Sequence, residues 1–434
     1  MLDLSKASIR NAKSFLLFQA FFLLLLLFES GCSSYLVVSG GAVNPAKLRE
    51  IKEALPSVRG LDFKRDVQVE VANKNGMNRH FEKELERDYG DRKLENISLA
   101  YTKLGLLPQG VDLKNSLLSF YLSQVAAFYN PDDQKIVVPE NLGAGVLLGT
   151  VQFFARRDIL GEMVLAHELT HALQDQHFSL QSRLRQKGNN DKVIAFRALA
   201  EGDATLSGFG YLFGGLSDET LAQVRKAVQD SLRQARSELA AIPEAIAEEL
   251  LFQYYGGVSF VSHALNSGGW PGINRLYHAP PESTEQVLHP EKYFDKADAP
   301  TEINLGDLSF LFQPGWEEIE NDVLGELMIG VLFRRFVSEK EAQSASQGWD
   351  GDRFVAFRRQ NEIFFIWATV WDSLQDAEEF ERSYRMIVAQ KYPASEESRW
   401  AYLERRDRRV VIVEGLEASQ VGESIERIWR GMEP

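Results

Sequence analysis

The chain has 434 residues and a formal net charge of −14, from 62 acidic and 48 basic side chains. This acidity excludes nucleic acid as an expected partner, because phosphate backbones bind to clustered Lys and Arg side chains. The single cysteine rules out an internal disulfide. The length exceeds that of a typical single domain, so two or three subdomains are expected.

The amino terminus has the pattern of an export signal. Three basic residues precede an apolar run at 15–28. That run is too short to span a membrane comfortably, but it has the length of the hydrophobic region of a signal peptide. We therefore expect residues 1–31 to be a signal peptide and the mature protein to be exported.

A lone cysteine follows this run. Ser30, Gly31 and Cys32 resemble the bacterial lipoprotein cleavage box, although Glu29 stands where that box has an aliphatic residue. The resemblance implies a lipid anchor at Cys32 and a location in the bacterial cell envelope, with residues 32–44 as a linker. An ordinary signal peptide and a retained transmembrane anchor stay open as alternatives.

Residues 45–140 are expected to combine helices with a small sheet. Helical patterns occupy 45–55, 78–89 and 97–106, and a strand pattern occupies 67–71. Two further apolar stretches, 125–129 and 135–138, flank the turn sequence Asn-Pro-Asp-Asp-Gln and predict a hairpin. This sheet would precede the next, strongly apolar helix.

The most informative stretch is the motif HExxH at residues 167–171. Apolar residues of helical period surround it, and Asp158 is placed to cap the helix start. On a helix, positions i and i+4 lie on one face, so His167 and His171 can reach a single ion. Neutral imidazole suits Zn²⁺, and Glu168 beside the first histidine can take a proton from the attacking water. The motif therefore predicts a zinc site with Glu168 as general base.

A catalytic zinc site needs a third protein ligand, and two residues compete for this role. Glu201 lies in an apolar helical segment, Ala-Leu-Ala-Glu-Gly-Asp-Ala-Thr. His177 lies at the spacing of the third histidine in the metzincin pattern HExxHxxGxxH, but Gln174 stands where that pattern needs its turning Gly. On a continuing helix, His177 would also be rotated away from His171. We favour Glu201, with His177 ending the helix or lining the cleft.

The combination of HExxH with a downstream Glu resembles the gluzincin clan of zinc peptidases. The string Glu-Gly-x-Ala that starts at Glu201 is similar to the Asn-Glu-Gly-x-Ala box of the aminopeptidase branch, but Ala200 replaces the Asn. Asp203 does not match the supporting Asp of the thermolysin branch, so its role stays open. The resemblance implies a zinc ion held by both motif histidines and Glu201, and a peptide or protein substrate.

Peptidases of this kind also need a donor for the oxyanion that forms during hydrolysis. The segment that begins at Phe252 resembles the Tyr-x-x-Gly-x-x-x-Leu helix start of the aminopeptidase branch, with Tyr254 at the tyrosine position. The resemblance implies Tyr254 as this donor. Tyr255 stays open as an alternative, and His289, in a polar and proline-rich stretch at 280–293, is a further cleft candidate.

The remaining segments predict a helical subdomain and a small α+β module. Residues 195–277 are expected to be mainly helical, with Pro243 dividing an Ala- and Glu-rich stretch. Beyond residue 301, strand patterns occupy 353–357, 363–371 and 409–413. Helical patterns occupy 374–390 and 422–429. The two helices would cover one face of the sheet, and residues 350–352 resemble a turn.

We therefore expect an α+β protein with a zincin-like core and a second module. Residues 45–300 would form the core, with a small sheet, the HExxH helix and a helical subdomain, and residues 301–434 the C-terminal module. The leading hypothesis is zinc-dependent hydrolysis of peptide bonds in the bacterial envelope. The alternative is a catalytically degenerate zincin-like lipoprotein that acts as an envelope binding or assembly factor, and a third is a zinc hydrolase that acts on another envelope bond.

Overall fold

Helices and three small sheets make up this computed structural model, so the predicted α+β class is confirmed. The structure describes residues 35–124, 127–140, 142, 157–308, 315–392, 400–416, 421–422 and 425–432. The predicted signal peptide at 1–31, the anchor Cys32 and the start of the predicted hairpin at 125–126 lie outside these residues. Among the described residues, no helix is long and apolar enough to cross a membrane.

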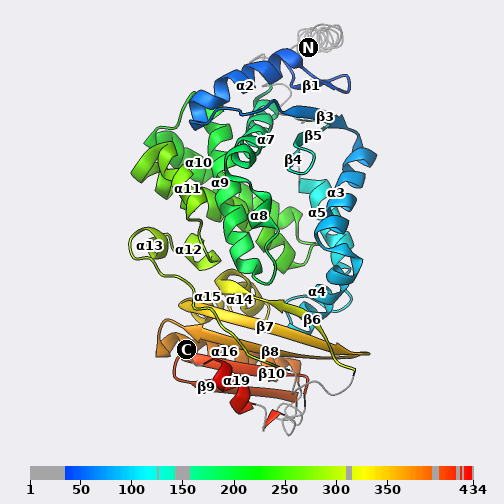
Figure 1. The fold of residues 1–434 in the computed structure, drawn as a ribbon, viewed down its shortest axis with the longest axis vertical. Helices are drawn as coiled ribbons and strands as arrows, with labels where there is room; N and C mark the ends of the chain where they lie inside the picture. The colour runs from blue at the N-terminus through cyan, green and yellow to red at the C-terminus, as the bar shows by residue number, and fades with distance from the viewer. Residues whose placement is uncertain are drawn as a thin grey trace, which may run out of the picture.

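The amino-terminal helix α2 (Pro45–Arg59) lies at one end of the molecule, beside the helices of the centre (Figure 1). It starts where predicted because the Asn44 side chain accepts hydrogen bonds from the first turn and Pro45 suits its first position. It ends at Gly60, whose φ of 75° is a left-handed conformation. The preceding segment, expected to be a plain linker, contains a short strand pair, β1 (Val38–Ser39) and β2 (Ala42–Val43).

A three-stranded sheet follows, in the order β3-β5-β4. The strands are β3 (Gln68–Ala72), β4 (Phe128–Asn130) and β5 (Lys135–Pro139). Between β3 and β4 lie three helices, α3 (Lys74–Asp88), α4 (Gly90–Leu104) and α5 (Leu113–Gln124). The predicted hairpin is present, since β4 pairs antiparallel with β5, while β3 pairs parallel with β5. β4 is therefore an edge strand of this sheet.

The centre of the molecule is helical. Its main helices are α7 (Ile159–Phe178), α8 (Gln181–Leu184), α9 (Asn190–Phe213), α10 (Asp218–Glu238) and α11 (Glu244–His278). α9 packs between α7 and α11. The predicted break at Pro243 is present, because this residue caps the start of α11. Tyr254 lies well inside α11, so the prediction that its segment opens a helix is wrong.

The polar and proline-rich stretch at 280–293 contains two short helices. These are α12 (Thr284–Leu288) and α13 (Glu291–Phe294). Ser283 caps the start of α12 by accepting a hydrogen bond from the Gln286 backbone N–H.

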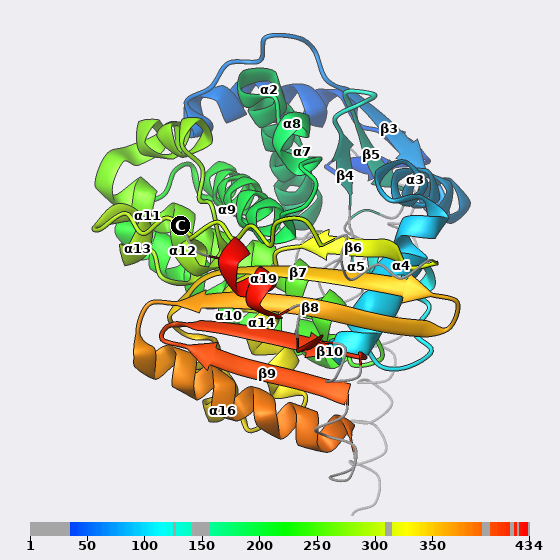
Figure 2. The same cartoon turned by 60° about the horizontal axis from the view of Figure 1, so that its bottom comes forward.

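The C-terminal module contains a five-stranded antiparallel sheet in the order β6-β7-β8-β10-β9 (Figure 2). Its strands are β6 (Glu317–Asp322), β7 (Trp349–Arg359), β8 (Glu362–Trp371), β9 (Ala401–Arg406) and β10 (Arg409–Glu414). Three of these strands were predicted, and β6 and β9 were not. The predicted turn at 350–352 is wrong, because these residues lie within β7, where the register shifts after Trp349.

Helices cover both faces of this sheet. They are α14 (Gly325–Arg334), α15 (Glu339–Ser346), α16 (Leu374–Lys391) and α19 (Ile425–Gly431). Alternate strand residues point to opposite faces, so Trp367 joins the hydrophobic cluster that contains α16, whereas Ile366 joins the cluster that contains α19. The prediction that both helices cover one face is therefore wrong.

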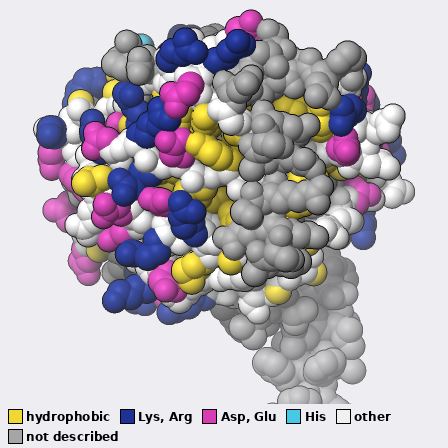
Figure 3. Space-filling model, turned by 90° about the horizontal axis from the view of Figure 1, so that it is seen from below, with side chains coloured by type: hydrophobic (Ala, Val, Ile, Leu, Met, Phe, Trp, Pro, Cys, Tyr) yellow, Lys and Arg dark blue, Asp and Glu magenta, His cyan; other side chains and the backbone are white. Residues whose placement is uncertain are grey.

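One hydrophobic core connects the helical centre to the module. It includes Phe252 of α11, Ile329 of α14 and Trp367 of β8, all fully buried. On the described part of the far side of the module, basic and acidic side chains are interspersed (Figure 3). Because they share this hydrophobic core, the module and the helical centre are packed against each other.

Candidate metal centre

Three helices position the candidate metal centre. α7 carries both histidines and Glu168, α9 carries Glu201, and α11 carries Tyr254. α7 begins at the predicted cap, because Asp158 accepts a hydrogen bond of 3.0 Å from the Gly161 backbone. Since Asp158 also accepts a 2.9 Å hydrogen bond from the Val37 backbone, the amino-terminal segment is tied to the start of this helix.

The structure brings the three predicted ligands together. The Nε2 atoms of His167 and His171 lie 3.1 Å apart. Oε2 of Glu201 lies 3.1 Å from His167 Nε2, and its Oε1 lies 3.4 Å from His171 Nε2. Among the described residues, this is the group of His, Cys, Asp and Glu side chains whose ligand atoms are close enough to hold a metal ion.

These spacings fit a zinc ion. Ligand atoms about 2.0–2.1 Å from zinc in a tetrahedral arrangement lie about 3.3–3.4 Å from one another. The three measured spacings, 3.1, 3.1 and 3.4 Å, are close to this value. Two imidazoles and one carboxylate also match the donor set of catalytic zinc sites that leave a fourth position open. The residues present therefore fit this metal.

Glu168 lies beside the group in a buried position. Its side chain is 5% exposed, and its Oε2 atom has no hydrogen-bond partner. Burial raises the pKa of this carboxyl group, while the neighbouring His167 and His171 lower it. A buried carboxylate oxygen without a partner is costly unless another group occupies that position, so Glu168 is available to accept a proton.

A cavity of about 240 Å³ opens at the group. It is lined by Glu168, by the three candidate ligands and by apolar side chains, including Phe81, Phe120 and Phe128. The edge strand β4 contributes Phe128 and Tyr129, and the Tyr129 backbone forms a hydrogen bond with Glu168. The edge of the small sheet is therefore next to the metal group, by which we mean the side chains of His167, His171 and Glu201.

Tyr254 faces this cavity, and Tyr255 does not. The ring centroid of Tyr254 lies 6.5 Å from that of His167, and its side chain is 40% exposed. The negative charge of Glu201 raises the pKa of the Tyr254 phenol well above its usual value, so the hydroxyl stays protonated and can donate a hydrogen bond. Tyr255 instead packs its ring against Phe252 at 5.5 Å.

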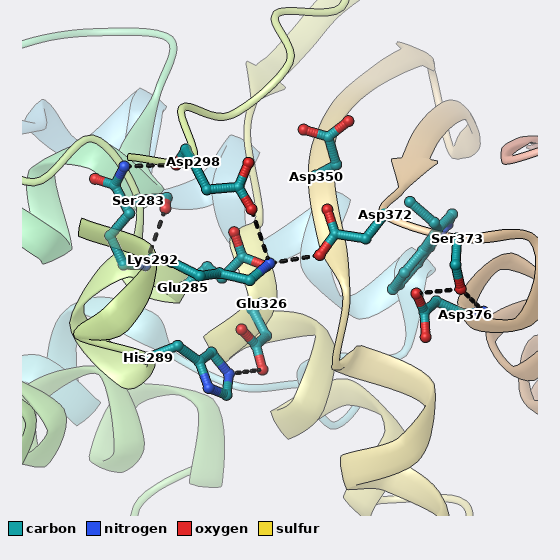
Figure 4. A network of polar contacts seen from close by, with 12 residues as sticks. Ser283, Glu285, His289, Lys292, Asp298, Glu326, Asp350, Asp372, Ser373 and Asp376 are labelled. Atoms are coloured by element: carbon teal, nitrogen blue, oxygen red, sulfur yellow. Dashed lines mark hydrogen bonds and ion pairs between the residues drawn. The ribbon is translucent and has the colours of Figure 1, made fainter. Parts of the chain in front are cut away.

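The two other histidine candidates lie elsewhere. His177 is at the end of α7, where its Nε2 atom is 2.8 Å from the Asp62 carbonyl oxygen. His289 is 2.9 Å from Glu326 of α14, at the contact between the helical centre and the C-terminal module (Figure 4). The prediction that His289 lines the cleft is therefore wrong, because an ion pair with the module holds it there.

Sequence reasoning missed the polar side chains behind the centre. Gln174, noted only as a departure from the metzincin pattern, lies 2.9 Å from His171 Nδ1. Asp203, whose role was open, accepts hydrogen bonds from Gln174 and from Arg59 of α2. The sequence could have indicated the contact between Gln174 and His171, because residues three apart on a helix lie on one face. Nothing in the sequence pattern indicated Arg59.

Comparison with known proteins gives one partial match. A family described as a domain of unknown function (DUF8575) matches residues 312–424. That stretch covers most of the C-terminal module and none of the candidate metal centre. Neither a search of curated proteins nor a search of solved structures found a match.

Proposed function

We propose that this protein is a zinc-dependent peptidase of gluzincin type. The observation that carries the proposal is the convergence of three ligand atoms beside a buried carboxylate that lacks a partner. His167, His171 and Glu201 supply the ligand atoms, and Glu168 supplies the carboxylate. A solvated surface helix with two unrelated histidines would not bring a carboxylate from a second helix to both imidazoles.

The arrangement of the elements supports a zincin-like core. In such cores a small sheet precedes the HExxH helix, and an edge strand binds an extended peptide by adding it as a further strand. Here β4 is an edge strand, and Phe128 and Tyr129 line the cavity at the metal group. A peptide paired with β4 would have its backbone beside Glu168.

Each side chain of the site has a separate role in the proposed hydrolysis. Zinc held by His167, His171 and Glu201 would supply Lewis acidity, which lowers the pKa of water and polarises a carbonyl oxygen. Glu168 would accept the proton of the attacking water and later deliver it to the leaving amine. Tyr254 would donate its phenolic hydrogen to the oxyanion that forms on the substrate carbonyl.

Cleavage of a peptide library by the zinc-loaded protein tests this proposal. We expect cleavage that a chelator abolishes and zinc restores. Glu168→Gln should keep stoichiometric zinc but lose roughly 10²–10⁴-fold in turnover, because an amide cannot accept the proton. Stoichiometric zinc together with undiminished cleavage in this variant would contradict the mechanism, and zinc without any cleavage in the wild type would contradict peptidase activity.

The proposed location is the bacterial cell envelope. It rests on the signal-like pattern at 1–31 and on Cys32, which lie outside the described residues. A lipid anchor at Cys32 would hold the protein at a membrane. Labelled palmitate that appears in the wild type and is lost in Cys32→Ser would support the anchor, and equal labelling of both would exclude it.

A further inference from the structure

Gln174 is a fully buried polar side chain directly behind the metal group. It lies one turn after His171 on α7, and its Oε1 atom is 2.9 Å from His171 Nδ1. The proposed function assigns it no role. A buried amide at this position is costly unless all its hydrogen bonds are satisfied, so its partners determine its orientation.

Two acceptors fix the orientation of this amide. The Gln174 Nε2 group donates to the Ala200 carbonyl oxygen at 2.9 Å and to Asp203 Oδ2 at 2.9 Å. Neither partner can donate in return, so the nitrogen must face them and the oxygen must face His171. An amide oxygen only accepts hydrogen bonds. His171 must therefore carry a hydrogen on Nδ1, which leaves the Nε2 lone pair directed at Glu201 and His167.

Asp203 is itself held by buried donors. Arg59 donates to Asp203 through Nε at 2.6 Å and Nη2 at 2.9 Å, and the Tyr277 hydroxyl donates to its Oδ2 at 2.8 Å. Arg59 and Asp203 are both fully buried. Arg59 also donates to Asn274 at 2.8 Å and lies over the Trp270 ring. Side chains of α2 and α11 thus hold the Asp203 carboxylate of α9, which orients Gln174.

We propose that Gln174 is the positioning residue of the metal centre. It connects the Asp203 carboxylate to His171 and fixes the tautomer and the ring orientation of that ligand. Metal-binding histidines commonly donate their second ring N–H to a carboxylate or a carbonyl oxygen. Here a glutamine stands between the histidine and the carboxylate. The inference rests on the zinc site of the proposed function, but not on peptidase activity.

A pair of matched variants tests this role. Gln176 is a second buried amide on α7, but it binds the backbone of Lys64 and Arg65, away from the metal group. Gln174→Met should weaken zinc binding by roughly 10–100-fold, the usual effect of losing such a supporting partner. Gln176→Met should leave the zinc Kd unchanged. Competition with a chromophoric chelator measures both values.

The melting temperatures of both metal-free variants distinguish a role of Gln174 in positioning His171 from a general role in folding. Each variant loses a buried amide with several hydrogen bonds, so both should lower the melting temperature of the metal-free protein. Only Gln174→Met should also raise the zinc Kd. A wild-type Kd in Gln174→Met, or an equal loss of affinity in both variants, would overturn the proposal.

A measurement on the wild type covers the case in which Gln174→Met does not fold. In the zinc-loaded protein, ¹⁵N NMR should show a slowly exchanging hydrogen on Nδ1 of His171, and a hydrogen on Nε2 would overturn the proposal. Zinc binding with the expected variant pattern but no peptide cleavage would reject the peptidase function and keep the positioning role. A wild-type protein that binds no zinc would overturn both.

Discussion

Tyr254 and Tyr255 are neighbours in the sequence but belong to different environments. Successive residues on an α-helix point about 100° apart, so the two rings leave α11 in different directions. Tyr254 lies at the metal group, and Tyr255 lies against Phe252, near Glu248 and Arg236. At the scale of single residues, the direction of each ring and the side chains packed around it therefore separate the donor candidate from its neighbour.

Removal of the Tyr254 hydroxyl should impair catalysis without loss of the metal. If Tyr254 donates to the oxyanion, Tyr254→Phe should lower kcat by roughly 10²–10³-fold, the usual cost of one such donor. KM should change little, because the hydrogen bond acts mainly in the transition state. Steady-state kinetics on a cleaved peptide provide the measurement. Tyr255→Phe is the matched control, and a large loss there with normal activity in Tyr254→Phe would reverse the assignment.

The third metal ligand is testable without any substrate. Glu201→Ala removes the carboxylate that contacts both imidazoles, so zinc affinity should fall by more than roughly 100-fold, beyond the usual loss from a supporting residue. His177→Ala should leave it nearly unchanged, because His177 contacts the Asp62 carbonyl instead. Metal analysis after dialysis against a weak chelator distinguishes the two, and the opposite pattern would favour the metzincin arrangement.

At the scale of secondary structure, two glycines let α9 and α11 come close together. A Cβ atom on Gly202 would collide with the Gly257 backbone, and one on Gly257 would collide with the Ala198 carbonyl oxygen. This contact lies one residue from Glu201 on α9 and three residues from Tyr254 on α11. The close approach of the helices is therefore part of how these two side chains come to face one cavity.

Gly257→Ala should destabilise the fold. The added methyl group would meet backbone atoms, which cannot rotate away, so we expect a loss of about 3 kcal/mol in the free energy of unfolding. Urea unfolding of the metal-free protein measures this loss. Gly330→Ala on α14 is the control, because the atoms nearest to its methyl group belong to side chains, the closest being the Ser346 hydroxyl oxygen at 3.3 Å. Similar stability of the two variants would contradict this view of the helix contact.

At the scale of the whole molecule, the C-terminal module is held to the body by polar contacts as well as by the shared core. Lys292 of α13 forms ion pairs with Glu285 of α12, with Asp298 and with Asp372, which follows β8 (Figure 4). His289 and Glu326 form a second link. Because the hydrophobic core is continuous across this contact, we expect the two parts to unfold together.

The packing of the module also buries an acidic group that lacks a full set of partners. In β6 the register shifts between Glu318 and Glu320, and Glu320 is 7% exposed with an Oε2 atom that has no partner. Burial, and then the charge of Asp322, raise the pKa of Glu320 to about 7. Its usual value of 4.5 applies in the unfolded chain, so the folded state holds the extra proton.

This shift predicts a pH dependence of stability. Between pH 4.5 and about 7 the folded state binds more protons at Glu320 than the unfolded state, so stability falls as pH rises through this window. Glu320→Gln should therefore stabilise the protein above pH 7, by up to about 3 kcal/mol, with little gain at acidic pH. Glu318→Gln, at an exposed position, is the control for urea unfolding at several pH values. An equal gain at all pH values would contradict the prediction.

Short-range patterns were enough to predict much of the local structure. Asp158 at the start of α7, Pro45 and Pro243 at the starts of α2 and α11, and the turn between β4 and β5 all act through neighbours a few residues away. The pairing of His167 with His171 belongs to the same class, because positions i and i+4 meet on any helix. Glu201 was selected by its resemblance to a family box, since nothing local links it to these histidines.

What the sequence by itself determined is therefore many of the elements and which of their residues share a face. Only the tertiary structure decided which faces meet. It placed Arg59 beside Asp203, Gln174 between Asp203 and His171, and His289 beside Glu326. The physical reason is that hydrophobic periodicity records burial but not the identity of the covering partner. A buried polar group shows its role only when packing brings its donors and acceptors together.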